Sequence, residues 1–210
     1  MSPPIAAGLR LGLLAGTAVA LLAAIHALTR ERIAESQRRL ERQALAEVLP
    51  PGRHDHDPLA DVIEICDEAQ LGPGRHRLYR LRRLGQPSAL VVHAVAPDGY
   101  SGPIALMVGV DVAGKVLGVR VTEHRETPGL GDAIEAAKNP WIRQFEGRSL
   151  GDPPAERWRV GRRGGDFDAL LGATVSSQAV TEAVRRVLEL IEREGTSLFS
   201  EDGPETLRCP

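Results

Sequence analysis

The first long pattern in the chain is an apolar run near its start. Residues 11–28 read LGLLAGTAVALLAAIHAL, and only Thr17 and His26 interrupt the run. A helix of about 20 apolar residues crosses the hydrocarbon core of a bilayer. A cleaved signal peptide is the alternative, but its apolar core is usually only about 7–15 residues long, and the polar stretch that follows offers no small-residue cleavage site. We therefore predict a retained transmembrane anchor over residues 1–29.

The next segment alternates charged residues with apolar ones at helical spacing. The apolar stripe consists of Ile33, Leu40, Ala44 and Val48. Pro50, Pro51 and Gly52 then end the pattern, since proline cannot continue a helix. Residues 30–52 are thus predicted to form a helical stem or linker.

Short apolar and alternating runs then predict a sheet. The predicted strands are residues 61–66, 77–84, 88–96, 104–112 and 115–123. Only Ala113 and Gly114 separate the last two runs. Strands joined so closely pair in antiparallel fashion, so the sheet is predicted to be antiparallel.

The clearest element is a helix near the C-terminus, because apolar side chains repeat at helical spacing and charged ones occupy the other face. Its apolar positions are Val180, Ala183, Val184, Val187, Leu188 and Ile191. Gly195 stands where a C-cap is expected. We also predict a helix over 131–145, a short strand over 157–160 and a loose polar tail over 196–210. The fold class is therefore α+β: an antiparallel sheet with packed helices, over residues 53–195, behind one N-terminal transmembrane helix.

Composition narrows the classes of function. Hydrophobic residues make up 42% of the chain, charged residues 26%, and the net charge is -2. Because the charges are scattered, there is no basic footprint for nucleic acid. Aromatic residues are only 3%, which argues against base-stacking platforms. We expect no nucleic-acid partner.

Cysteine and histidine usage points to no strong metal chemistry. Cys66 and Cys209 form no CxxC motif, so a protein-held iron–sulfur cluster is not expected. A bond between them can form in an oxidising compartment, but the place of Cys209 in a polar tail argues against it. The run RHDHDP at 53–58 contains ligand-type residues, and a solvated loop is the favoured interpretation over a metal site.

Two motifs carry candidate chemistry. Gly172 and Ala173 remove side-chain bulk just before the last helix, and Thr174, Ser176 and Ser177 place hydroxyls around its first turn. A helix N-terminus with unpaired N–H groups binds phosphate well. The alternative for Thr174 is that it caps its own helix. The second motif, residues 124–131, combines polar groups with two glycines and a proline; the alternative there is a simple connecting loop.

Taken together, four segments resemble one family in order and spacing. They are residues 100–104 (YSGPI), 124–131 (HRETPGLG), 164–168 (GGDFD) and 172–174 (GAT). The family is the G subunit of the Rnf (Rsx) electron transport complex, to which the C subunit of the sodium-translocating NADH:quinone reductase is related. The resemblance covers nearly the whole chain.

The resemblance implies a covalent cofactor, FMN, whose phosphate is esterified to Thr174. Asp168 matches the acidic position recognised by the flavin transferase, and Ser176 and Ser177 are expected to donate hydroxyl hydrogens to the phosphate. Leu171 departs from the family's usual Ser or Thr, which puts a side-chain contact in question. The second motif looks like the wall facing the isoalloxazine, through His124, Glu126, Thr127, Pro128, Gly129 and Leu130.

The function that the resemblance implies is electron relay within an ion-translocating oxidoreductase complex linked to NADH or ferredoxin, in which this chain is not a catalyst alone. The chain has no dinucleotide fingerprint, so it requires the other Rnf subunits as partners, beside the flavin transferase and the lipid bilayer. The alternative is a membrane-tethered assembly or sensor module with a degenerate flavin site.

The resemblance also implies a single-pass protein of the bacterial inner membrane, with its flavin domain on the periplasmic side. The charge pattern argues the other way. One arginine, Arg10, precedes the span, whereas Arg30, Arg32, Arg38 and Arg39 follow it. The positive-inside rule would place the large domain in the cytoplasm. We follow the family.

Overall fold

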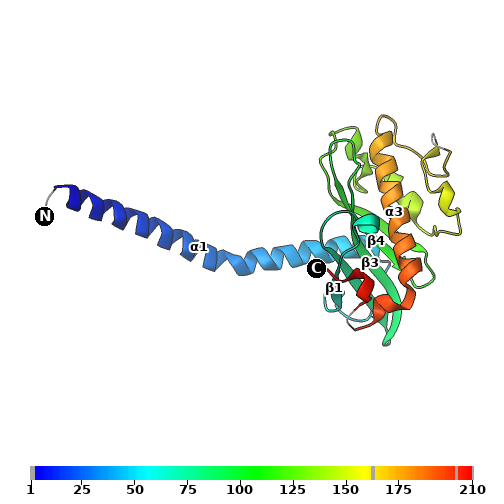
Figure 1. The fold of residues 1–210 in the computed structure, drawn as a ribbon, viewed down its shortest axis with the longest axis horizontal. Coiled ribbons are helices and arrows are strands. Elements are labelled where there is room, and N and C mark those ends of the chain that lie inside the picture. Colours follow the sequence, from blue (N-terminus) through cyan, green and yellow to red (C-terminus); the bar gives the residue numbers. More distant parts are fainter. Residues whose placement is uncertain (1–2, 162–163, 202, 210) are drawn as a thin grey trace. The chain divides into compact units, whose positions relative to one another are not determined.

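The structure is a computed structural model that describes residues 3–161, 164–201 and 203–209 (Figure 1). The chain divides into two compact units, residues 1–41 and 42–210. Residues 1–2 of the predicted anchor and residues 202 and 210 of the predicted tail lie outside the described part.

The first unit is helical. Helix α1 extends over Pro3–Val48, and its residues up to Glu41 make up this unit. The side chains of residues 11–28 are exposed to the surroundings, as expected of an apolar surface that faces lipid. By length and composition this helix can cross a membrane, in agreement with the predicted anchor.

The second unit contains a five-stranded antiparallel sheet in which neighbours in sequence are neighbours in space. The strands are β1 (Val62–Ile65), β2 (His76–Arg83), β3 (Gln86–Ala96), β4 (Ile104–Asp111) and β5 (Val116–Glu123). The short helix α2 (Glu68–Leu71) lies between β1 and β2. All five predicted strands are confirmed, each within two residues of its expected bounds.

Both faces of the sheet are covered, which explains why β4 is apolar at nearly every position. One face packs against α3 (Thr174–Glu194), as Figure 1 shows, and the predicted apolar stripe of that helix is entirely buried. The other face receives the last turns of α1 through Leu45 and Val48. Gly109 makes this possible, since a Cβ there would lie 2.4 Å from the Val48 carbonyl oxygen.

The segment predicted as one helix over 131–145 is instead two 3₁₀ helices, η1 (Gly131–Ile134) and η2 (Pro140–Phe145). The residue before a proline is disfavoured in the helical region, and Asn139 is accordingly extended, with φ -152° and ψ 138°. Its side chain then caps η2 by accepting from the Trp141 N–H.

The strand predicted over 157–160 is also wrong. Residues Ala155–Arg157 form the 3₁₀ helix η3, and Val160 makes only an isolated parallel bridge with Phe167. This segment contributes to the core without forming a strand. Trp158 is fully buried and packs its ring on Phe145 and Phe167.

The C-terminal segment makes ordered contacts with the domain that its polar composition did not predict. It forms the 3₁₀ helices η5 (Gly195–Phe199) and η6 (Glu205–Leu207), which bury Leu198 and Leu207. Arg80 and Arg82 of β2 donate to backbone carbonyls in it. The prediction of a loose tail is therefore wrong for its described residues.

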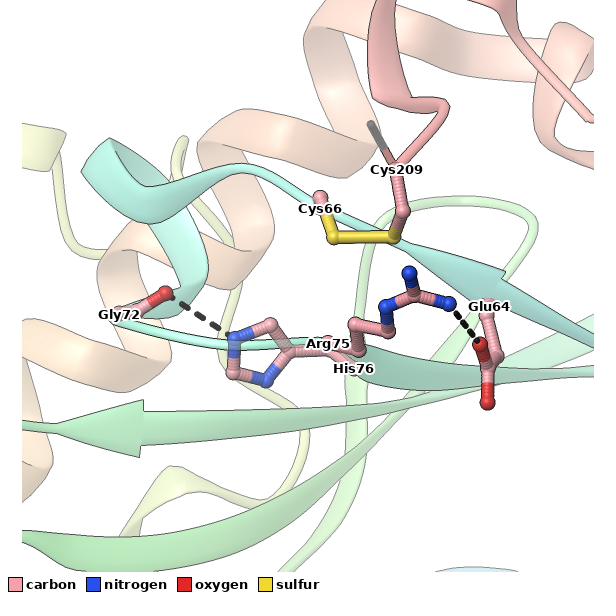
Figure 2. The surroundings of a disulfide bond; sticks show 6 residues. All are labelled: Glu64, Cys66, Gly72, Arg75, His76 and Cys209. Carbon is pink, nitrogen blue, oxygen red and sulfur yellow. Dashed lines mark hydrogen bonds and ion pairs between the residues drawn. A yellow bond between two sulfur atoms is a disulfide. The ribbon is translucent and has the colours of Figure 1, made fainter.

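A disulfide joins Cys66 and Cys209 (Figure 2). The Cys66 N–H also donates to the Leu207 carbonyl at 2.8 Å, so the tail lies beside the chain that follows β1. The expectation that the two cysteines stay apart fails because burial of Leu207 brings Cys209 back to the domain.

Candidate functional site

Thr174 is the first residue of α3 and is half-buried. The N-cap position belongs to Ala173, and no side chain caps the helix there. Within the described residues, the Thr174 hydroxyl has no hydrogen-bond partner. Thr174 therefore does not cap its own helix, and its hydroxyl is available for chemistry.

The backbone around Thr174 favours an anion. The first intrahelical bond runs from the Ser177 N–H to the Ala173 carbonyl at 3.0 Å. The N–H groups of the three preceding helical residues therefore have no partner within the helix. With the positive end of the helix dipole, they form the kind of place that binds phosphate.

The serines of the first turn have other roles than the predicted donation to phosphate. Both are fully buried. Ser176 donates its hydroxyl hydrogen to Glu126 Oε2 at 2.6 Å. Ser177 donates to the Ala173 carbonyl at 2.9 Å and accepts from the Leu170 N–H at 3.0 Å. Because a hydroxyl has one hydrogen, both serines stabilise the turn instead.

Gly172 allows Leu130 to pack closely against the chain just before α3. Its φ of +80° favours glycine. A Cβ at this position would lie 2.7 Å from the Leu130 Cδ1, so the second motif packs directly against the first. The structure thus brings together the two motifs that the sequence singled out.

Glu126 lies beneath this junction and does not form an exposed wall. Its side chain is only 4% exposed. Besides the bond from Ser176, its Oε1 accepts from the Ser101 N–H at 3.1 Å. Its backbone N–H donates to His124 Nδ1 at 3.0 Å. Three segments therefore meet at one carboxylate, which is not placed to line a flat ligand.

The rest of the second motif forms a tight, exposed turn. The Thr127 carbonyl accepts from the N–H groups of Leu130, Gly131 and Asp132. Residues 127–130 are exposed, and Leu130 retains 47% of its surface. This turn, unlike Glu126, can face a ligand.

A charged cluster fixes the far side of that turn. Glu135 Oε1 lies 2.9 Å from His124 Nε2, and Lys138 donates to both Glu135 and Asp132. The hydrogen bonds from Lys138 hold the pKa of both carboxyls below their ordinary values. His124 is thus engaged in this cluster, half-buried behind the turn.

Asp168 presents an exposed side chain on a fixed backbone. Its carbonyl accepts from Trp141 Nε1 at 2.6 Å, and its N–H donates to Gln144 Oε1 at 2.7 Å. The neighbouring Asp166 is different, because its carboxylate pairs with Arg157, which lowers the pKa of Asp166. Of the two, Asp168 is the one available for recognition from outside.

Apolar side chains are exposed on the segments that meet at Thr174. Leu171 and Val175 flank it in sequence, Leu130 packs on Gly172, and Tyr100 precedes the Ser101 that binds Glu126. The exposed fractions of Leu171, Val175, Leu130 and Tyr100 are 86%, 42%, 47% and 72%. Exposed apolar side chains on neighbouring segments are typical of a surface that a ligand or partner can cover.

A cavity elsewhere in the domain is a separate feature. A cavity of about 540 Å³ is lined by residues such as Leu90, Leu188 and Phe199, near the C-terminal end of α3. At 1.5 Å per residue, Leu188 lies roughly 20 Å along the helix from Thr174. The candidate site is therefore marked by the Thr174 hydroxyl, which has no hydrogen-bond partner among the described residues, and not by this cavity.

Comparison with known proteins gives one consistent result. A model of the FMN-binding domain matches residues 99–189, and a model of the RnfG N-terminal region matches residues 5–48. A relative in Pseudomonas aeruginosa (strain UCBPP-PA14), named as the G subunit of the ion-translocating oxidoreductase complex, is 47% identical over 193 residues, 91% of this chain and 90% of the relative. This chain belongs to the RnfG family.

Two further members of the RnfG family carry the same name. That of Escherichia coli (strain K12) is 44% identical over 179 residues, covering 85% of this chain and 86% of the relative. That of Photorhabdus laumondii is 40% identical over 200 residues, covering 95% of this chain and 91% of the relative. The predicted family, the FMN-binding fold and membership of an oxidoreductase complex are thereby confirmed.

The FMN-binding domain match contains every candidate site residue of this RnfG family member. Sequence reasoning missed Ser101, whose N–H holds Glu126, and Gln144, whose side chain holds Asp168. The only available signal for Ser101 was its place in the YSGPI segment. Nothing in the sequence pointed to Gln144, because its partner is the backbone N–H of Asp168.

Proposed function

We propose that this protein carries FMN in a phosphoester bond to Thr174 and relays electrons within the membrane complex. The observation that carries the proposal is the Thr174 hydroxyl, half-buried and without a partner in the described residues, at the start of a long helix. The residues present fit the cofactor: free N–H groups and the helix dipole suit its phosphate, and exposed apolar side chains suit its ring.

The attachment requires an activated donor. Thr174 Oγ1 forms the new bond to phosphorus and loses its proton. Expulsion of hydroxide from free FMN would be unfavourable, so the bond that breaks is the phosphoanhydride of a flavin dinucleotide, and a nucleoside monophosphate leaves. We propose that a flavin transferase supplies this donor and recognises Asp168, whose side chain is exposed beside the site.

When bound, FMN supplies one- and two-electron transfer, and the chain's own residues supply tethering and orientation. The ester leaves the isoalloxazine ring free to meet a partner. Leu130, Leu171 and Val175 offer it an apolar surface. Electrons must enter and leave through other members of the complex, because this chain holds no dinucleotide fingerprint.

The alternative of a degenerate flavin site rests on Leu171. That side chain is 86% exposed, so it is not packed into the junction of Gly172 and Leu130. The departure from Ser or Thr therefore does not weaken the attachment proposal.

We propose that α1 anchors the protein in the inner membrane and that the flavin domain faces the periplasm. The Cys66–Cys209 disulfide supports this side, because such bonds persist in oxidising compartments. The arginines after the span argue for the cytoplasm. We give the disulfide more weight, since long domains are translocated largely regardless of charge.

Mass spectrometry tests the attachment. The full chain, co-expressed with the flavin transferase, should gain the mass of one FMN less one water on the peptide containing residues 172–177. An unmodified Thr174 in the assembled complex would refute the proposal. For orientation, the protein from intact cells, denatured without reductant, should resist maleimide labelling; ready labelling of both cysteines would place the domain in the cytoplasm.

A further inference from the structure

Glu126 connects segments that are far apart in the chain. Its Oε2 accepts from Ser176 Oγ in the first turn of α3, fifty residues later in sequence, at 2.6 Å. Its Oε1 accepts from the Ser101 N–H in the turn before β4 at 3.1 Å. Both oxygens of a nearly fully buried carboxylate are thereby satisfied, as a buried charge requires.

Gly131 keeps space for this side chain. A Cβ at Gly131 would lie 2.8 Å from Glu126 Oε2 and 2.9 Å from its Cβ. Gly131 has no positive φ, so backbone conformation does not account for it. A Cβ at Gly99 would lie 2.9 Å from Glu126 Oε1, but its nearest neighbour would be the Gly102 carbonyl oxygen at 2.2 Å. The surrounding chain is shaped to hold a carboxylate at this place.

The contact lies in the same helical turn as Thr174. Ser176 has no freedom to turn outward while it donates to Glu126, because it is completely buried. Fixing Ser176 fixes the rotation of the first turn of α3, and hence the direction of the Cα–Cβ bond that carries the hydroxyl two residues earlier. An error of about 1 Å in such a position can slow a reaction about a hundredfold.

We propose that Glu126 is a positioning residue for flavin attachment, acting through Ser176 to orient Thr174 toward the incoming phosphorus. This inference rests on the proposed attachment at Thr174. It assigns Glu126 to the attachment step and removes it from the surface facing the isoalloxazine ring. Positioning affects the transfer itself, whereas recognition of the protein belongs to exposed groups such as Asp168.

Steady-state kinetics of the purified flavin transferase, with the full chain in detergent as substrate and a flavin dinucleotide as donor, separate these roles. Glu126→Gln keeps the shape of the side chain, removes its charge and replaces one acceptor oxygen by an NH2 donor, so the contact with Ser176 is no longer a hydrogen bond to a charged group. We expect kcat for labelling to fall about tenfold, the typical worth of a hydrogen bond to a charged group, while KM for the protein stays unchanged. Asp168→Ala should instead raise KM.

Ser176→Ala removes the same contact from the other side. It provides the test of the contact if Glu126→Gln does not fold. The double variant should be no slower than the slower single variant, because both act through one contact. The matched control is Glu189→Gln, which breaks an ion pair with Arg185 on the same helix, remote from Thr174.

Wild-type kcat in Glu126→Gln, or multiplied defects in the double variant, would overturn this inference while leaving attachment at Thr174 intact. A rise in KM without a fall in kcat would also overturn it, because a general disturbance of the fold acts in that way. A wild-type chain that takes up no flavin at Thr174 would instead refute the proposed function.

Discussion

Leu130 occupies the space that a side chain at Gly172 would need. An ideal Cβ at Gly172 lies 2.7 Å from Leu130 Cδ1, and Gly172 has a φ of +80°. We therefore expect Gly172→Ala to destabilise the domain by about 1–2 kcal/mol, from backbone strain and from displacement of Leu130. Thermal unfolding measures the loss, and flavin labelling should fall with it.

A matched control separates strain from crowding. Gly114 has a similar φ of +76°, but nothing lies within 4 Å of its added Cβ. Gly114→Ala should therefore cost about 1 kcal/mol from strain alone. Adding Leu130→Ala to Gly172→Ala should recover part of its stability. If the two glycine variants were equally unstable, Leu130 would have no part in the effect.

Thr174→Ala should abolish covalent flavin and leave the fold intact. Since the hydroxyl makes no hydrogen bond within the described residues, its removal should change the free energy of unfolding by less than about 0.5 kcal/mol. In-gel flavin fluorescence after denaturation checks the labelling. Thr174→Ser should retain part of it, because a hydroxyl remains.

Ser177→Ala is the contrasting variant. Its hydroxyl bonds the Leu170 N–H and the Ala173 carbonyl in a fully buried place. We expect a loss of about 1–3 kcal/mol there, because a buried donor loses its partner, with labelling still detectable. A covalent flavin that persists in Thr174→Ala would show that another residue is the attachment point.

The sequence predicted the sheet and α3 well because both depend on local patterns. Apolar runs and the helical repeat from Val180 to Ile191 identify buried faces without knowledge of partners. The turn proposed for flavin attachment could be singled out from the sequence, since Gly172, Ala173 and Thr174 are adjacent. Prediction failed where order depends on distant partners: Asn139 and Pro140 interrupted a plausible helix, and Leu207 ordered a tail that looked solvated.

The same reason explains the misassigned site residues. Glu126 was expected to face the isoalloxazine because its motif resembles that of the family, but its partners Ser101 and Ser176 lie 25 and 50 residues away. Hydroxyls at a helix start resemble phosphate ligands in sequence. Only the structure shows that the hydrogens of Ser176 and Ser177 are already donated elsewhere.

The disulfide should contribute strongly to stability. It links positions 143 residues apart, and a bond that closes so long a loop restricts the unfolded chain considerably. We expect Cys66→Ser to lower the free energy of unfolding by about 2–5 kcal/mol. Reductant should lower the Tm of the wild type and leave that of the variant unchanged. Equal responses to reductant would show that the bond does not form in solution.

The charged cluster behind the 127–130 turn should make stability depend on pH. Lys138 holds the pKa of Asp132 and Glu135 below their ordinary values of 3.8 and 4.5. A carboxyl with a lowered folded pKa stabilises the protein above its unfolded pKa and loses that contribution as the pH falls through the folded pKa. Lys138→Met should therefore lower the Tm near pH 6 slightly, since Lys138 is 47% exposed. The gap from the wild type should narrow below about pH 4; a gap that widened on acidification would contradict this assignment.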